Sequence, residues 1–244
     1  MKGVILAGGR GTRLYPCTLV VNKHLLPIYD QPMIYYPIQT LVSAGCKEIL
    51  IVTGGENPGE FMRLLKNGKE FGLDSIVYAY QENPTGGIAD ALSLAKSFVG
   101  KEKFCVVLGD NLILDNLSEH FAQYEKEPLG TAKVFIKEID NPKAFGVAEI
   151  SEGKVINIIE KPPNPPTNLA VVGVYLYDHT VFDIIKTISP SKRGEMEITD
   201  VNMAYIRNDS LTYAKLDSEW LDTGNFASLY EANCIIAKKK NIIK

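Results

Sequence analysis

Short apolar runs that end at a glycine alternate with helix-like segments over the first part of the chain. Lys2 to Ala7 is one such run, and Glu48 to Thr53 is a second that is rich in β-branched residues. Runs of this length suit strands that are buried on both faces of a parallel sheet. Between them, Met33 to Ala44 has helical spacing and Gly45 stands where a helix would stop. The pattern predicts a strand, helix, strand unit.

The same alternation continues beyond this unit. Helices are expected over Glu60 to Asn67 and Ile88 to Phe98, and strands over Ser75 to Tyr80 and Phe104 to Leu108. This order implies parallel strands joined by right-handed crossovers. In open sheets of this kind, ligands bind beyond the carboxyl ends of the strands. We therefore expect the strand ends at Gly8, Gln81 and Asp110 to converge.

The second part of the chain changes to strand-like segments separated by turns rich in proline and asparagine. These segments are Thr131 to Ile139, Gly146 to Ile150, Val155 to Glu160 and Leu169 to Tyr177. We interpret 161–166 as a rigid surface loop, and we expect a terminal helix over Phe226 to Ala237. The predicted fold is α/β, a Rossmann-like mixed, mostly parallel sheet flanked by helices. It forms a single domain, 1–244, with halves 1–127 and 128–244.

Composition and charge narrow the classes of function. The 244 residues are 45% hydrophobic and 23% charged, which is ordinary for a globular chain and argues against disorder. The 26 basic and 29 acidic residues give a net charge of -3, so we expect no nucleic-acid partner and no membrane surface. Any binding of anions must therefore be local.

The four cysteines are far apart and lack the spacing of a metal cluster or a disulfide framework. We expect free, mostly buried thiols. The N-terminus has no signal-peptide core, and no run reaches the ~18 apolar residues of a membrane span. A cytoplasmic location is the prediction.

The glycine-rich run after the first strand is the first candidate for chemistry. Gly8, Gly9 and Gly11 would let backbone amides approach an anion, and Arg13 adds a fork for phosphate oxygens. The run is not a Walker A loop, and the dinucleotide-binding spacing fails at Leu14. Alone, it is equally consistent with a structural turn.

Further motifs occur in order along nearly the whole chain. They are GGRGTRLYP, NKHLLPIYDQPMIYYP, VLGDN, FGVAEI, EKP, GVYLYD, RGEMEITD and WLDTG. Together they resemble the sugar-phosphate nucleotidyltransferases, a family with the nucleotide-diphospho-sugar transferase type of fold. Within that family the similarity is greatest to the enzymes that couple dTTP to glucose 1-phosphate.

The resemblance implies an in-line attack of the sugar-phosphate oxygen on the α-phosphorus of the triphosphate, with release of pyrophosphate. It also implies Mg²⁺ as cofactor, dTTP or UTP and glucose 1-phosphate as substrates, and a homo-oligomer. Because the nucleophile is already an anion, catalysis needs cations and carboxylates more than a general base. Longer members carry a C-terminal extension with a regulatory site, so we expect no feedback through that site here.

Residue by residue, the resemblance assigns the following roles. Catalytic residues are Arg13, Lys23 and Asp110, and the magnesium ligands are Asp110 and Asp222. Nucleotide contacts are Leu6, Gly8, Gly9, Gly11, Thr12, Arg13, Lys23, Gln81, Gly86, Gly87 and Asp110. Sugar-phosphate contacts are Asn111, Gly146, Glu160, Lys161, Val172, Gly173, Arg193 and Glu197.

The residue types suit these roles. Gln81 offers the donor and the acceptor that the imide edge of thymine or uracil requires. Glu160 can accept hydrogen bonds from sugar hydroxyls, and Arg193 can engage two phosphate oxygens. The stretch after Gln81 departs from the usual form, which leaves the register of Gly86 against Gly87 open.

Three alternatives remain. The core motifs are shared by uridylyltransferases and by enzymes that act on other sugar phosphates. A non-catalytic binding protein on the same fold would lack the carboxylates or cations that are present here. An NAD-dependent oxidoreductase would need the dinucleotide spacing that this glycine run lacks.

Overall fold

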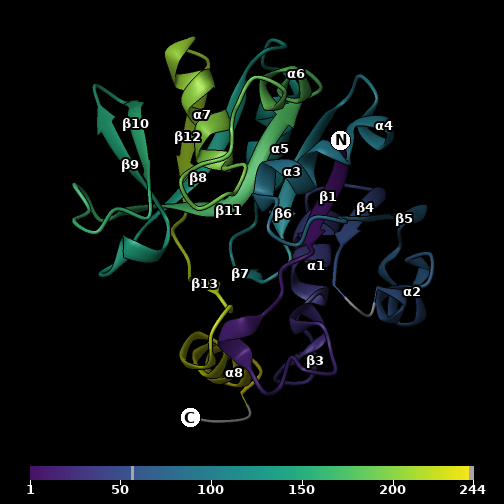
Figure 1. The fold of residues 1–244 in the computed structure, drawn as a ribbon. Helices are drawn as coiled ribbons and strands as arrows, with labels where there is room; N and C mark the ends of the chain where they lie inside the picture. The colour runs from purple at the N-terminus through teal and green to yellow at the C-terminus, as the bar shows by residue number, and fades with distance from the viewer. Residues whose placement is uncertain (56–57, 242–244) are drawn as a thin grey trace.

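The computed structural model describes residues 1–55 and 58–241, and Figure 1 shows their path. Within them one nine-stranded sheet forms the centre. Its strands are β1 (Lys2–Ala7), β4 (Glu48–Thr53), β5 (Ser75–Tyr80), β6 (Lys103–Leu108), β8 (Ala132–Glu138), β9 (Gly146–Ser151), β10 (Lys154–Glu160), β11 (Leu169–Asp178) and β12 (Leu211–Lys215).

The sheet is mixed, as the sequence predicts. The spatial order is β10-β9-β11-β6-β1-β4-β5, with β8 beside β11 and β12 beside β8. The strands of the first half pair in parallel, whereas β11 runs antiparallel to β6, β8 and β9. Because β6 pairs with β11, one sheet runs through both halves of the chain.

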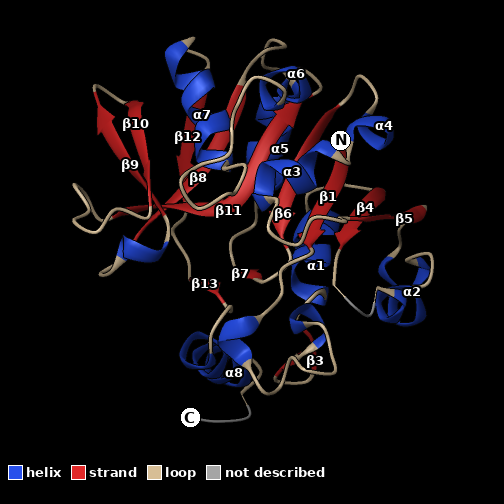
Figure 2. Ribbon diagram, viewed as in Figure 1, coloured by secondary structure: helices blue, strands red, loops and turns tan. Residues whose placement is uncertain are grey.

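Helices cover both faces of this sheet (Figure 2). The helices of the described residues are α1 (Tyr35–Ser43), α2 (Gly59–Leu65), α3 (Gly87–Ser93), α4 (Lys96–Val99), α5 (Ser118–Glu125), α6 (Val181–Ile185), α7 (Ile198–Arg207) and α8 (Phe226–Lys239), and the last of these lies away from the sheet. Buried side chains of α3, α6 and α7 form one apolar cluster, and those of α1, α2 and α5 form another. The central strands supply residues to both clusters, which explains why they are apolar on both faces.

The predicted helix from Ile88 to Phe98 is two helices, α3 and α4. The amides of Leu94 and Ala95 bond to carbonyls three residues back, to Ala91 and Leu92. This tighter 3₁₀ turn interrupts the α-helical ladder. The other predicted elements lie within a few residues of the observed ones, and 161–166 lies in a loop between β10 and β11.

Several elements were not predicted from the sequence. They are helices α5, α6 and α7, strand β12 and the two-stranded sheets β2 (Pro27–Ile28) with β3 (Gln31–Pro32) and β7 (Asn111–Ile113) with β13 (Trp220–Asp222). Of these, α7 does show helical spacing of its buried residues, with Ile198, Val201 and Tyr205 on one face. The β7–β13 pair places Asp222 opposite Asn111. Helix α8 packs with β2 in a separate cluster at the bottom of Figure 1.

All four cysteines are free, and Cys46 and Cys105 are buried as expected, whereas Cys17 is exposed. Across the described residues, no helix has both the length and the apolar character to cross a bilayer.

Candidate active site

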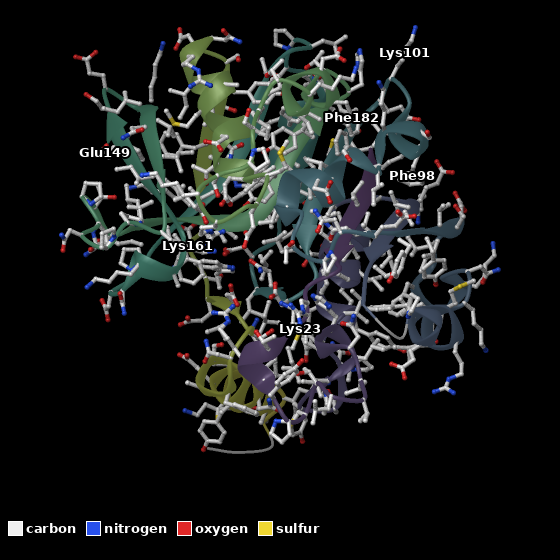
Figure 3. The ribbon with its side chains drawn as sticks, in the orientation of Figure 1. Lys23, Phe98, Lys101, Glu149, Lys161 and Phe182 are labelled. Atoms are coloured by element: carbon white, nitrogen blue, oxygen red, sulfur yellow. The ribbon has the colours of Figure 1, made fainter. Side chains whose placement is uncertain are left out.

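The carboxyl ends of the parallel strands meet at a cavity of about 420 Å³. Figure 3 shows Lys23 below these strand ends, between the sheet and the region of α8. The predicted residues that line this cavity are Leu6, Gly8, Gly9, Gly11, Thr12, Arg13, Lys23, Gln81, Gly87 and Asp110. The expected convergence of Gly8, Gln81 and Asp110 is therefore present in the structure.

The glycine run gives room to functional side chains. A Cβ on Gly8 would lie 2.8 Å from Gln81 Oε1, and one on Gly9 would lie 3.2 Å from Lys23 Nζ. Gly11 has a φ of 64°, and a Cβ there would lie 3.0 Å from the Cβ of Lys23. The three glycines thus allow Gln81 and Lys23 to reach the cavity across the turn.

Lys23 makes an ion pair with Asp110 in which both side chains are largely buried. Lys23 begins a 3₁₀ helix, Lys23–Leu25, and the side chain of Asn22 caps it by accepting the amide of His24 at 3.0 Å. The same oxygen lies 2.7 Å from His24 Nδ1, so that ring nitrogen carries the proton. Burial first, and then the charge of Lys23, lower the pKa of His24 to about 3.

Asp110 and Asp222 come together although they are distant in sequence. The amide and hydroxyl of Thr223 donate to the backbone oxygen of Asp110 at 2.9 and 2.8 Å, and Gly224 N donates to Asp222 Oδ1 at 2.8 Å. Burial and then the charge of Asp110 raise the pKa of Asp222 to about 6. Burial works in the same direction at Asp110, but Lys23 holds the pKa of that carboxyl well below its usual range.

These two carboxylates fit a hard divalent cation. Two buried carboxylates that repel each other are stabilised when a cation lies between them, and oxygen ligands suit magnesium. Among the described residues, no group of three or more acidic, histidine or cysteine side chains is arranged to hold a metal ion, so this pair would supply two protein ligands only. A cation at this pair would complete its coordination with substrate oxygens, as is usual for Mg²⁺ bound with phosphates.

One end of the cavity, where the sequence predicts the contacts with the base, is formed by Gln81 and the turn that follows it. Gly87 lines the cavity, whereas Gly86 is buried and does not. Gly87 has a φ of 87°, and a Cβ there would lie 2.6 Å from Met196 O. The register left open by the sequence therefore places Gly87 toward the cavity, and Gly86 behind it with its carbonyl accepting from Met196 N at 2.8 Å.

A smaller cavity of about 100 Å³ adjoins the first and shares Ile88 and Leu108 with it. The predicted sugar-phosphate residues that line it are Asn111, Gly146, Glu160, Lys161 and Gly173, together with Asp222. Asn111 Oδ1 accepts from Gly173 N at 3.1 Å and from Trp220 Nε1 at 2.7 Å. These bonds fix the Asn111 amide, whose nitrogen donates to Asp110 Oδ1 at 3.1 Å.

The β9–β10 hairpin supplies the acidic wall of this cavity. Glu160 Oε2 accepts from the hydroxyl of Thr199 at 2.5 Å, and Glu160 Oε1 lies 3.4 Å from Lys161 Nζ. Gly146 faces Glu160 across the hairpin. Figure 3 shows Lys161 near the base of this hairpin.

Three predicted sugar-phosphate residues lie outside the lining of this cavity. Val172 faces the opposite side of β11 and packs in the apolar core, so only its backbone is near the site. Arg193 is held by carboxylates, with Nη2 2.5 Å from Glu195 Oε2 and Nε 3.1 Å from Glu197 Oε1. Glu197 also accepts from Ser191 Oγ at 2.7 Å.

Several lining residues were not predicted as site residues. Arg10, His24 and Glu195 line the larger cavity, and Thr199 and Trp220 line the smaller one. Arg10 and His24 stand inside motifs that the sequence analysis singled out, so adjacency to matched residues is a signal that could have found them. Glu195 and Thr199 likewise stand inside the RGEMEITD motif, but the contact of Thr199 with Glu160 depends on the packing of α7 against β10.

The fold and the site define a class: an α/β protein with a nucleotide-sized cavity at the strand ends, two neighbouring carboxylates and a buried lysine. A family model for nucleotidyl transferases matches residues 2–239. The chain belongs to the nucleotidyl transferase family.

Several individual proteins are similar to this chain over nearly its whole length. The chain is 44% identical to the glucose-1-phosphate thymidylyltransferase of Neisseria meningitidis, over 99% of this chain and 84% of the relative. It is 41% identical to that of Mycolicibacterium smegmatis, over 96% and 81%. A Bacillus anthracis protein described as a candidate glucose-1-phosphate thymidylyltransferase, solved with sucrose, superposes with a TM-score of 0.91 at 45% identity, covering 96% of this chain and 94% of that one. A UDP-glucose pyrophosphorylase complexed with UDP-glucose gives 0.83 at 26% identity, covering 98% of each chain.

Proposed function

We propose that this protein is a glucose-1-phosphate thymidylyltransferase, which transfers a thymidylyl group from dTTP to glucose 1-phosphate and forms dTDP-glucose and pyrophosphate. The observation that best supports this proposal is that the two cavities adjoin each other. The larger contains Asp110, Lys23 and the glycine run, the smaller contains Asp222 and Lys161, and both share Ile88 and Leu108. Similarity to thymidylyltransferases over nearly the whole chain supports the choice of substrates.

In this proposal the first half of the chain holds the nucleotide and the second half the sugar phosphate. The glycine run and Arg13 bind the triphosphate, because close backbone amides and a guanidinium suit phosphate oxygens. Gln81 and Gly87 bind the base. Lys161 and Glu160 bind the phosphate and the hydroxyls of the sugar, and Arg193 can join them by exchanging a carboxylate partner for phosphate.

A phosphate oxygen of glucose 1-phosphate attacks the α-phosphorus, the bond from that phosphorus to the bridging oxygen breaks, and pyrophosphate leaves. Lys23 stabilises the negative charge that develops on the phosphate oxygens, and its burial strengthens the interaction. Asp110 and Asp222 would hold a divalent cation, Mg²⁺ in this proposal, which would neutralise phosphate charge. The nucleophile is an anion throughout, so no side chain has to accept a proton.

Initial rates of pyrophosphate release test the proposal, with dTTP or UTP paired with glucose 1-phosphate and with other sugar 1-phosphates. We expect dTTP with glucose 1-phosphate to give the highest kcat/KM. A strong preference for another sugar phosphate would refute the assignment.

The second candidate is a UTP-dependent enzyme. The similarity in fold to a UDP-glucose pyrophosphorylase favours it, since thymine and uracil present the same imide edge. A preference for UTP in the same rate measurements would select this candidate. A cytoplasmic location and a homo-oligomer remain predictions from the sequence and the resemblance.

A further inference from the structure

The side chain of Gln81 is held by two groups of the protein. Its Nε2 donates to Asp90 Oδ2 at 2.7 Å and to Gly87 O at 3.2 Å. The residue is 7% exposed, and that exposure lies in the wall of the larger cavity. The base-binding glutamine is therefore already oriented before any nucleotide arrives.

The chemistry of the two partners determines which end of the amide faces them. A carbonyl oxygen and a carboxylate oxygen can only accept, so the NH₂ group must point toward them. Both N–H bonds of Gln81 are then used within the protein. Oε1 points the other way, against Gly8, where a Cβ would lie 2.8 Å from it. No group in residues 1–55 or 58–241 donates to this oxygen, so it is available to a ligand.

Asp90 reaches Gln81 from helix α3 by crossing the preceding turn. A Cβ on Gly86 would lie 2.1 Å from Asp90 Oδ2, so only glycine leaves room for the carboxylate there. This close approach explains why position 86 is glycine. The explanation differs from that for Gly87, which lines the cavity. Asp90 itself does not line the cavity, so it can act on a ligand only through Gln81.

We propose that Asp90 is a positioning residue that holds the Gln81 amide with only its carbonyl oxygen facing the base, so that the site selects pyrimidines that carry a hydrogen at N3. Thymine and uracil donate this N–H to Oε1. Cytosine presents an acceptor at N3, which would face a second acceptor and leave both buried and unpaired. This inference rests on the proposed use of a thymidine or uridine nucleotide, and it adds the group that enforces the choice.

The test compares three variants with the wild-type protein. Asp90→Leu keeps a branched side chain but removes the acceptor, so the Gln81 amide keeps one partner and can turn its NH₂ toward the base. Asp90→Asn keeps an oxygen that can still accept. Glu82→Gln removes a negative charge from an exposed side chain next to Gln81 in sequence and serves as the matched control.

The readout is the ratio of dTTP to CTP affinity, measured by calorimetry without sugar phosphate, together with kcat and KM for turnover. For Asp90→Leu we expect the ratio to fall about tenfold and KM for dTTP to rise, with kcat nearly unchanged. Asp90→Asn should retain most of the ratio, and Glu82→Gln all of it. Circular dichroism and the thermal midpoint confirm that each variant is folded.

An unchanged ratio in a folded Asp90→Leu protein would overturn the inference. Equal losses in Asp90→Asn, Asp90→Leu and Glu82→Gln would also overturn it, because they would point to charge instead of an oriented acceptor. If the wild-type protein shows no turnover but Asp90→Leu still lowers the ratio of dTTP to CTP affinity, the proposed reaction is refuted and the inference stands. Normal turnover with no Asp90 effect would refute the inference alone.

A measurement on the wild-type protein does not depend on the folding of any variant. N3-methyl-dTTP lacks the hydrogen that Oε1 would accept and carries a methyl group in its place. We expect it to bind at least a hundredfold more weakly than dTTP, because it leaves a buried acceptor unpaired. Equal binding of the two nucleotides would contradict the orientation assigned to Gln81.

Discussion

Lys23 is the residue on which the charge balance of the site depends. It is the buried cation beside Asp110, and Asp110 in turn opposes Asp222. It packs tightly against Gly9 and Gly11, where a Cβ would lie 3.2 and 3.0 Å from its atoms. A single lysine therefore links the glycine run to the pair of carboxylates.

Replacing Lys23 by Met should remove charge stabilisation while keeping a side chain of similar length. We expect kcat to fall on the order of 10²-fold or more, because a preorganised charge in a buried site contributes several kcal/mol to the transition state. Steady-state kinetics measures the effect. Lys101→Met is the control, since Lys101 lies far from Lys23 in Figure 3. Similar rates in both variants would exclude Lys23 from catalysis.

His24 should make the stability of the protein depend on pH. Its pKa is lowered from 6.5 to about 3, so the fold accommodates only the neutral ring. Above pH 6.5 the ring is neutral in both the folded and the unfolded state, and its contribution to stability is complete. As the pH falls from 6.5 toward 3, the free energy of unfolding decreases, and the loss is roughly 3 kcal/mol at pH 4.

Urea unfolding of the wild-type protein and of His24→Asn between pH 7 and pH 4 measures this contribution. Asn can still donate to Asn22 but cannot gain a proton, so its loss of stability with acidification should be smaller. In the control variant His120→Asn, the free energy of unfolding should change with pH as it does in the wild-type protein. If the free energy of unfolding of His24→Asn falls with pH as steeply as that of the wild-type protein, the acid sensitivity arises from residues other than His24.

At the scale of elements, two short strands decide how the site is assembled. Strand β7 continues directly from the end of β6 and pairs with β13, which brings Asp222 beside Asp110. Gly173 of β11 lies against Asn111 and donates its amide to Asn111 Oδ1. The smaller cavity therefore depends on contacts among β7, β11 and β13, although β7 and β13 have only three residues each.

Gly173→Ala tests these contacts. A Cβ there would lie 2.6 Å from Asn111 Oδ1, which is already bonded to Gly173 N and Trp220 Nε1. We expect Asn111 to shift and KM for glucose 1-phosphate to rise about tenfold, with a smaller change for dTTP. Gly59→Ala is the control, because nothing lies within 4 Å of that position. An unchanged KM would mean that the sugar phosphate makes no use of Asn111.

At the scale of the whole molecule, the two halves share one sheet and one apolar cluster, so we expect them to fold as one unit. One apolar cluster combines Val4, Leu50 and Phe104 with Tyr177 and Val201, so residues of both halves bury one another. The continuous β6–β11 pairing has the same consequence. The active site lies where these halves meet, so its geometry depends on the complete core.

A fragment of residues 1–127 should therefore not fold on its own. It would expose the edge of β6 and half of the apolar cluster, and a small domain cannot offset that loss. We expect no cooperative thermal transition in calorimetry, whereas the full chain gives one. A sharp transition in the fragment would divide the protein into independent domains.

Much of this architecture follows from local pattern. Strands β1, β4 and β5 have the predicted bounds. For β1 and β4 the reason is that a run buried on both faces is apolar throughout and ends where the chain must turn, whereas β5 lies at the edge of the sheet with Val77 and Tyr80 exposed. The candidate phosphate-binding and metal-binding residues were predicted from short motifs, of which those with Gly8, Asp110 and Lys161 follow strand ends, whereas Lys23 begins a 3₁₀ helix.

The sequence by itself determined most strands of the large sheet, the residue types of the candidate site and the strand ends at Gly8, Gln81 and Asp110. The resemblance already implied that Asp110 and Asp222 lie together. Only the tertiary structure decided that Asp90 meets Gln81 and that Arg193 meets Glu195 and Glu197. It also placed Val172 on the core side of β11. Periodicity reports how one segment divides between core and solvent, whereas these contacts depend on pairing between distant segments, which the complete packed core selects.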